Sequence, residues 1–277
     1  MAINPLQQYF RQPKIYVSLP SQGIFNTPGT IDGDPNQLAV CAMTGMDEVI
    51  IKTPDALFTG EASVKLIESC CPSIKNAWDL SILDTELMFV AIRIATYGNN
   101  ITIANTCPEC ETENDYELNL NVIIEHFSKC KYDNTVALKD LTIRLKPLNY
   151  KQQTDYNLQI YELQKQVRQA TDIVDTAEQQ SALNKLWEDL AQIQLSLNIN
   201  SIDSVETPEV TVNERAHIAE WLANCESEVS TKIKNAIDDN RNTWTIPPYS
   251  VTCTNPECKH ESKLTIDLDN SNFFALA

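Results

Sequence analysis

Glycine and histidine are scarce in this sequence, although many catalytic motifs need them. The 277 residues include six glycines and three histidines, and no G-x-x-x-x-G-K-[ST] phosphate loop occurs. Neither G-x-G-x-x-G nor the nucleophile motif G-x-S-x-G is present. His126, His217 and His260 are scattered, and none lies in an H-E-x-x-H motif. We therefore expect that the protein is not an enzyme.

Basic residues are also few. The 21 lysines and arginines are outnumbered by 38 aspartates and glutamates, which gives a formal net charge of −17. Such a surface repels phosphate backbones and anionic lipids, and no run of lysine or arginine would form a local basic patch. We expect protein partners and no binding of nucleic acid.

Long apolar runs are missing as well. No stretch approaches the ~20 consecutive apolar residues of a membrane-spanning helix, so we expect no membrane span. The first residues, MAINPLQQYFRQPK, lack the apolar core of a signal peptide. The nine cysteines are therefore expected in a reducing compartment, and their odd number argues against a complete disulfide framework. We expect five of them to be buried as small hydrophobic residues: Cys41, Cys70, Cys71, Cys130 and Cys225.

The other four cysteines lie in two similar phrases that are far apart in the chain. NTCPECETENDYELNL begins at Asn105, and VTCTNPECKHESKLTIDL begins at Val251. When Cys110 is aligned with Cys258, the residues that follow align without a gap. Each phrase predicts a knuckle, in which two thiols lie on a tight turn between an extended segment and a strand of alternating apolar residues.

Two knuckles together predict a structural zinc site. One knuckle supplies only half of a tetrahedral shell, and a second knuckle related by approximate twofold symmetry completes it. We predict that Cys107, Cys110, Cys253 and Cys258 bind Zn²⁺ and that the two hairpins pair into a zinc ribbon. A site closed by four thiolates has no open position for water, which argues against catalysis at the metal.

Other arrangements of these residues remain open. The first thiol pair could combine with His126 and Cys130, which would give a site of three thiolates and one imidazole. His260 could replace Cys258 as the fourth ligand. The pairs could also be disulfides or free thiols, although a reducing compartment disfavours disulfides.

The segment before the first thiol pair predicts several helices. Thr44 with Asp47 forms a capping-box-like pattern, and Thr53 followed by a proline marks a second helix start. A longer helix, SILDTELMFVAIRIATYG, ends at Gly98 and is apolar on nearly all sides. We expect this helix to lie in the centre of the core.

The region from Tyr150 to Asn200 contains neither glycine nor proline. It holds two apolar series with heptad-like spacing: Tyr156, Ile160, Leu163, Val167 and Ala170, and then Leu183, Leu186, Leu190, Ile193 and Leu197. The break between the series predicts an antiparallel helical hairpin, and one long helix with a stutter is the alternative. The hairpin either packs on its own domain or projects to contact a partner.

These elements predict an α+β fold. We expect a small mixed core of helices and strands, closed by a zinc-ribbon-like pair of cysteine knuckles and carrying an inserted helical hairpin. Residues 1–148 would form the N-terminal α+β core with the first knuckle, and residues 149–212 the hairpin insertion. Residues 213–277 would add the C-terminal helices and the second knuckle, which completes the metal site.

A set of motifs in the first half of the chain resembles a known family. We find, in this order, TPDALFTGEASVKLIESCCPSI, AIRIATYG, and CPEC with its following YELNL strand. This order is similar to that in the baseplate hub family of T-even-like contractile-tailed phages, and the resemblance covers roughly Lys14 to Leu120. It implies a structural or assembly protein of the virion tail baseplate, assembled in the host cytoplasm. The implied partners are other baseplate and tail hub proteins, and we expect symmetric copies.

Two other functions can be compared with this one. A zinc-ribbon regulator that binds nucleic acid would surround its knuckles with lysine, arginine and aromatic residues. Here the neighbours are mainly acidic: Glu109, Glu111, Glu113, Asp115, Glu257 and Glu261, with Lys259 and Lys263 as the nearby bases. A hydrolase of the tail tip would need a catalytic set, and the sequence contains no recognisable one.

Overall fold

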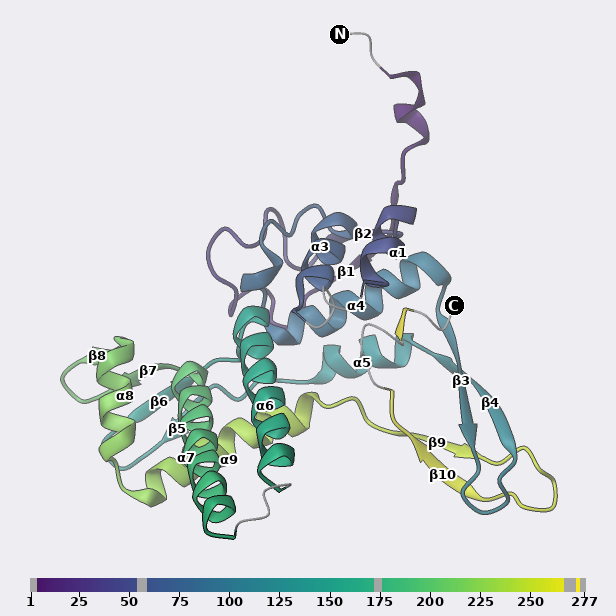
Figure 1. Cartoon of the computed structure of the whole chain (residues 1–277). Helices are drawn as coiled ribbons and strands as arrows, with labels where there is room; N and C mark the ends of the chain where they lie inside the picture. Colours follow the sequence, from purple (N-terminus) through teal and green to yellow (C-terminus); the bar gives the residue numbers. More distant parts are fainter. Residues whose placement is uncertain (1–3, 54–58, 172–175, 267–272, 275–277) are drawn as a thin grey trace. The chain divides into compact units, whose positions relative to one another are not determined.

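The computed structural model describes residues 4–53, 59–171, 176–266 and 273–274. The chain forms two compact units. The first unit comprises Met1–Cys130 and Trp244–Ala277, and the second unit comprises Lys131–Thr243. Helices and small antiparallel sheets occur in both units, which confirms the predicted α+β class (Figure 1).

The first unit contains short strand pairs around a set of helices. Its elements in chain order are η1 (Pro5–Tyr9), β1 (Pro13–Val17), β2 (Leu38–Cys41), α1 (Gly45–Ile51), α3 (Glu61–Cys70), η2 (Ala77–Asp79), α4 (Ile82–Tyr97), β3 (Asn100–Thr106), β4 (Glu113–Asn119), α5 (Asn121–Lys129), β9 (Tyr249–Thr252) and β10 (Glu261–Leu264). β1 pairs with β2, β3 with β4, and β9 with β10, in each case antiparallel. The helix start expected at Thr53 falls next to residues 54–58, outside the described residues.

Helix α4 forms the centre of the first unit's core, as predicted from its apolar sequence. It contacts α3, α5 and both strands of the β1–β2 pair. Met88, Val90 and Ile92 are completely buried, although they point to different sides of the helix. The helix ends at Gly98, whose positive φ of 94° is a conformation that favours glycine.

The start of α1 anchors the segment that precedes β1. Thr44 and Asp47 form the predicted capping box, with Asp47 N 3.2 Å from Thr44 Oγ1 and Thr44 N 2.7 Å from Asp47 Oδ2. Arg11 Nη1 lies 3.2 Å from the same carboxylate, and Arg11 Nη2 donates to Ser69 Oγ at 2.8 Å. Burial alone would raise the pKa of Asp47, but hydrogen bonds from Thr44 and the charge of Arg11 keep it below its ordinary value.

Residues 4–10, which we call the arm, precede this anchor and bury no side chain. Figure 1 shows the arm leading away from β1. Three large hydrophobic side chains in it are exposed: Leu6 by 61%, Tyr9 by 76% and Phe10 by 58%. The arm therefore gains nothing from the core of its own unit.

The second unit is built on a four-stranded antiparallel sheet of order β5-β6-β7-β8. Its elements are β5 (Thr135–Ala137), β6 (Thr142–Leu145), α6 (Tyr150–Thr171), α7 (Thr176–Ser201), β7 (Ile202–Glu206), β8 (Thr211–Val212), α8 (Arg215–Asn224) and α9 (Ser227–Trp244). Its core joins Ile143 and Ile202 of the sheet to Ile218 of α8 and Ile233 of α9. These four side chains are almost completely buried.

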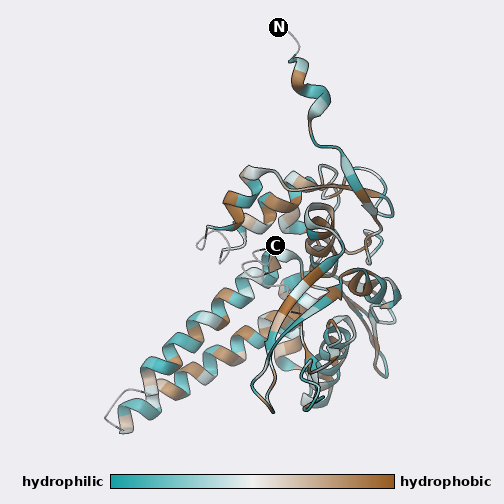
Figure 2. Ribbon diagram, turned by 90° about the vertical axis from the view of Figure 1, so that its right-hand side faces the viewer, coloured by the Kyte–Doolittle hydropathy of each residue, from teal (hydrophilic) through white to brown (hydrophobic). Residues whose placement is uncertain are grey.

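Helices α6 and α7 lie side by side and confirm the predicted hairpin rather than a single long helix (Figure 1). The connecting residues 172–175 lie outside the described residues. At one end, Leu197 packs into the core of the sheet. Farther along, Leu163, Ala170 and Leu186 form a separate small cluster. Figure 2 shows hydrophilic and hydrophobic residues mixed along both helices, as expected of amphipathic helices.

The two units have limits that differ from the three segments expected from the sequence. β6 pairs with β7, so the residues on both sides of the hairpin belong to one sheet and one core. The chain leaves the first unit after Cys130 and returns to it at Trp244. Near these points, the rings of Phe127 and Trp244 are stacked, with centroids 5.9 Å apart and an interplanar angle of 28°. None of the described helices has the length and hydropathy needed to cross a membrane.

Candidate metal centre

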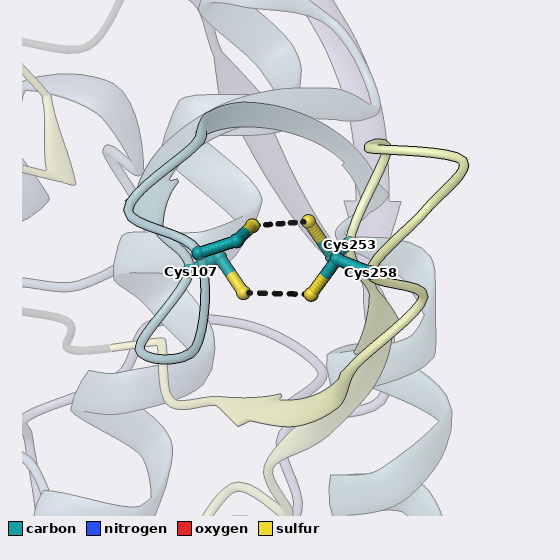
Figure 3. A group of neighbouring side chains, drawn as sticks. Cys107, Cys253 and Cys258 are labelled. Carbon is teal, nitrogen blue, oxygen red and sulfur yellow. Dashed lines mark hydrogen bonds between the residues drawn. The ribbon is translucent and has the colours of Figure 1, made fainter.

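Four cysteine side chains from two hairpins of the first unit meet at one point. One pair lies in the turn between β3 and β4, and the other in the turn between β9 and β10. The sulfur atoms of Cys107, Cys110, Cys253 and Cys258 all lie within 4.8 Å of one another. Figure 3 shows sulfur atoms from the two turns facing each other. The structure thus brings together the four cysteines that the doubled phrase singled out.

The separations of these sulfur atoms fit a tetrahedral metal shell. Cys107 Sγ lies 3.9 Å from Cys258 Sγ, and Cys110 Sγ lies 3.6 Å from Cys253 Sγ. A regular tetrahedron with Zn–S bonds of ~2.3 Å has edges of ~3.8 Å. Because a disulfide needs a sulfur–sulfur distance of ~2.05 Å, neither contact is a disulfide, and all nine cysteines are free thiols.

The first thiol pair is shaped by a tight turn after β3. Cys107 N donates to Thr112 O at 2.9 Å, which closes the turn, and Glu111 N donates to Cys107 O at 3.0 Å. Glu111 has a φ of 56°, in the left-handed region that side chains rarely adopt. This local reversal turns the second thiol of the pair toward the first and leads the chain into β4.

The second thiol pair repeats this turn with two additional residues. Cys253 N donates to His260 O at 2.9 Å, and Lys259 N donates to Asn255 O at 3.2 Å. Lys259 has a φ of 50°, so the residue after the second thiol is left-handed in both turns. In the gapless alignment Asn255 takes the place of the first cysteine, and Cys253 supplies its thiol from two residues earlier. The two thiol pairs therefore share the same backbone turn, although four residues separate the thiols in the second pair and two in the first.

Hydrogen bonds from the turns stabilise negative charge on the sulfur atoms. The Thr112 hydroxyl lies 3.2 Å from Cys110 Sγ. Hydrogen bonds from this hydroxyl and from the Thr112 backbone N–H lower the pKa of Cys110 to about 6. The His260 backbone N–H acts in the same way on Cys258, but the neighbouring sulfur of Cys110, desolvation and the sulfur of Cys107 together outweigh it and raise the pKa of Cys258 to about 12.

These opposed shifts show what the site requires. The thiolate of Cys110 forms readily, whereas the neighbouring sulfur atoms oppose ionisation of Cys258. A divalent cation at the centre would remove this repulsion, and zinc prefers four tetrahedral thiolates in structural sites. All four positions would then be filled by protein, so the arrangement fits a structural metal and offers no position for a reacting water.

The alternative ligand sets are not assembled in the same way. Among the residues that the structure describes, the cluster of four cysteines is the group of three or more such side chains that could hold a metal ion. His126 Nε2 lies 3.5 Å from Cys130 Sγ, so these two residues contact each other on α5 and at its end. His260 contributes its backbone N–H and carbonyl to the second turn, and its imidazole is not part of the cluster.

The hairpins differ from the expected ribbon in one respect. Within the described residues, β3–β4 and β9–β10 are two separate two-stranded sheets and do not share backbone hydrogen bonds. Side chains join them instead, and Tyr116 Oη donates to Thr252 O at 3.2 Å. Sequence reasoning did not identify Thr112, Asn114 or Asn255 as part of the centre, because polar residues in turns form no motif of their own.

The chain matches, over residues 42–275, the family described as T4 bacteriophage base plate protein. This chain belongs to that family. No curated protein and no solved structure matches the chain.

Membership confirms the resemblance to baseplate proteins of T4-like phages. The matched residues begin at Ala42, inside the segment from Lys14 to Leu120, and extend past Leu120 to include both thiol pairs and the whole second unit. A structural role in the phage tail baseplate, with other tail proteins as partners, follows from the family.

Proposed function

We propose that the protein is a structural or assembly component of the baseplate hub, which acts through protein contacts and catalyses no reaction. The match to the baseplate family over residues 42–275 carries this proposal. The motifs that resemble hub proteins, from TPDAL to the first thiol pair, support the assignment to the hub. The protein assembles in the host cytoplasm with other hub proteins, as symmetric copies around the tail axis.

The exposed arm supports a function based on protein contacts. Leu6, Tyr9 and Phe10 leave a large apolar surface in water, and burying it against a partner would be favourable. Residues 1–31 contain Arg11 and Lys14 but no acidic residue, whereas the whole chain carries a net charge of −17. The arm can therefore approach an acidic neighbour with less repulsion than the rest of the chain.

We also propose that each chain holds a single structural zinc ion, and the arrangement of the four cysteines supports this. The ligands are Cys107, Cys110, Cys253 and Cys258. Metal analysis of the purified protein should give close to one equivalent of zinc. Cys253→Ser should lose the metal, whereas Cys130→Ser serves as the matched control and should keep it. The opposite pattern would show that the site with His126 is the correct one.

A phage that lacks this gene tests the proposed role in the tail. We expect heads that are filled with DNA and tails that are defective. Immunolabelling of finished or intermediate baseplates should find the protein at the hub, on the tail axis. Normal tails, label at the baseplate rim, or tight DNA binding by the purified chain at physiological salt would each contradict the proposal.

Complementation tests the arm. The double variant Tyr9→Ser, Phe10→Ser should melt at the same temperature as the unchanged protein, because neither side chain is buried. It should nevertheless restore few tails. Tyr16→Ser is the control, because Tyr16 is 62% exposed but lies on β1, outside the arm. Equal restoration by both variants would exclude the arm as a contact surface.

A further inference from the structure

One buried amide connects the two thiol turns. Asn114 lies on β4, next to the first turn, and only 3% of its surface is exposed. Its Nδ2 donates to Thr112 O at 2.8 Å and reaches Asn105 O at 3.5 Å, so it binds the backbone of its own hairpin. The nitrogen of the amide is therefore bound within the first hairpin.

The oxygen of the same amide binds the other hairpin. Asn114 Oδ1 accepts a hydrogen bond from Thr254 N at 2.8 Å and another from Thr254 Oγ1 at 2.6 Å. Thr254 directly follows Cys253 in the chain, and Cys253 Sγ lies 3.7 Å from the same oxygen. One side chain thus ties the backbone beside Cys253 to the turn that holds Cys107 and Cys110.

This bridge has no counterpart on the other side of the approximate twofold symmetry. In the gapless alignment of the two phrases, Asn114 corresponds to Ser262, whose side chain is too short to span two turns. The remaining side-chain bonds between the hairpins are longer or more exposed. Tyr116 Oη donates to Thr252 O at 3.2 Å at the surface, and Asn255 Nδ2 lies 3.5 Å from Thr112 Oγ1. Among these side chains, Asn114 is the one that is buried and accepts two hydrogen bonds from the other hairpin.

An amide suits this position because it is a donor on one side and an acceptor on the other. Aspartate has a similar shape, but it cannot donate to Thr112 O when it is ionised, and it would add negative charge beside the thiolates. Alanine would leave the Thr254 N–H and the Thr112 carbonyl without this partner.

We propose that Asn114 is a positioning residue that holds the two thiol pairs at tetrahedral spacing before the metal binds. This inference rests on the proposed zinc site and adds the group that preorganises it. Because the sulfur atoms are then already arranged, metal binding does not have to order two independent hairpins. The site therefore binds the metal more tightly than it would without the Asn114 bridge.

Metal affinity in matched variants of the full chain tests this role. Zinc affinity is measured by competition with a chelator, and the site geometry by the absorption spectrum of the Co²⁺-substituted protein. Asn114→Ala should bind zinc about 10–100-fold more weakly, the range for outer-shell partners of metal ligands. Its Co²⁺ spectrum should lose intensity in the bands of a tetrahedral thiolate site. Asn114→Asp should weaken binding at least as much.

The control is Asn240→Ala in the second unit. Asn240 is 5% exposed and donates to Asp133 O at 2.7 Å while it accepts from Asp133 N at 2.8 Å, so it is a buried amide with similar bonding. This variant should lose stability but keep the zinc affinity and the Co²⁺ spectrum. If Asn114→Ala does not fold, Thr254→Val, which removes only the 2.6 Å bond, should show a smaller decrease in affinity.

The outcomes separate this inference from the zinc site itself. If the unchanged protein binds zinc and Asn114→Ala binds it equally well, Asn114 has no positioning role and the zinc site stands. Equal losses of affinity in Asn114→Ala and Asn240→Ala would show a general effect of destabilisation and would also overturn the inference. If the unchanged protein binds neither zinc nor Co²⁺, the zinc site fails and the inference fails with it.

Discussion

Glu111 and Lys259 adopt the same left-handed backbone conformation, with φ values of 56° and 50°. Each residue directly follows the second cysteine of its pair, and the two are matched in the gapless alignment of the phrases. The resemblance between the phrases therefore extends from residue types to backbone conformation. Neither residue is glycine, the residue that adopts this conformation without strain.

Replacing Glu111 by glycine should stabilise the first turn. A residue with a Cβ atom in the left-handed region destabilises the folded state by about 1–2 kcal/mol. Glycine removes this cost, but its greater conformational freedom in the unfolded chain offsets part of the stabilisation. We expect Glu111→Gly to raise the free energy of unfolding by about 0.5–1 kcal/mol in urea denaturation. Glu109→Gly, at an exposed position of the same turn without a positive φ, should give no increase. Equal effects at both positions would contradict the explanation.

Substitutions of two adjacent residues in α7 distinguish packing inside the hairpin from exposure at its surface. Leu186 is 8% exposed and belongs to the cluster with Leu163 and Ala170, whereas Trp187 is 67% exposed. Leu186→Ala should lower stability by about 2–3 kcal/mol, because it removes buried methyl groups and leaves a cavity. Trp187→Ala should change stability by less than about 0.5 kcal/mol.

Hydrogen exchange would locate the effect of Leu186→Ala. Amides of α6 and α7 around the cluster should lose protection, while those of the β5–β8 sheet, which has its own core, should keep it. Uniform loss of protection across the second unit would show that the hairpin and the sheet unfold together.

Glu86 should make stability depend on pH. This residue of α4 is partly buried, and burial raises the pKa of its carboxyl from 4.5 to about 7. A group with a raised pKa in the folded state stabilises the fold fully below its unfolded pKa, and this contribution is lost as the pH rises through the folded pKa. Above pH 7, Glu86→Gln should therefore be more stable than the unchanged protein by on the order of 2 kcal/mol.

The difference between these two proteins should shrink to about 0.4 kcal/mol at pH 4.5, where the folded carboxyl is neutral and the unfolded one is half ionised. Urea denaturation at pH 4.5, 6 and 8 would measure it. Glu125→Gln is the control, because Glu125 is exposed on α5 and only 3.9 Å from Lys129 in a surface ion pair. A pH-independent difference for Glu86→Gln would refute the pKa shift.

The first unit should fold without the second. Its strand pairs and the core around α4 are formed by its own residues. The stacked rings of Phe127 and Trp244 bring the two ends of the removed segment close together. A chain in which a flexible linker of about eight residues, able to span up to ~26 Å, replaces residues 131–243 should fold and bind one zinc ion. Circular dichroism and metal analysis would check this, and a molten, metal-free product would contradict it.

Local patterns predicted much of the first unit. The capping box at Thr44, the end of α4 at Gly98 and the pairing of the two cysteine phrases depend on residues that are close in sequence or visibly repeated. The two helices of the hairpin followed from apolar spacing without interruption by glycine or proline.

Long-range pairing was not predictable in the same way. β6 and β7 become neighbours only because the hairpin between them folds back, and β7 is five residues long without a clear alternating pattern. The units consequently have other limits than the apolar series suggested. The bonds of Arg11 to Ser69 and of Asn114 to Thr254 join residues that no motif connects. Such contacts depend on the final packing of short elements.

The separation of the two thiol pairs in the chain also determines when the metal centre can form during synthesis. Cys110 and Cys253 are 143 residues apart, and the second unit lies between them. At a synthesis rate of about 5–20 residues per second, the first thiol pair waits roughly 7–30 s on the ribosome for its partner. During this interval the second unit can emerge and begin to fold. The metal centre can be completed only after Cys258 has been made, so a chain that ends before Cys253 cannot form it.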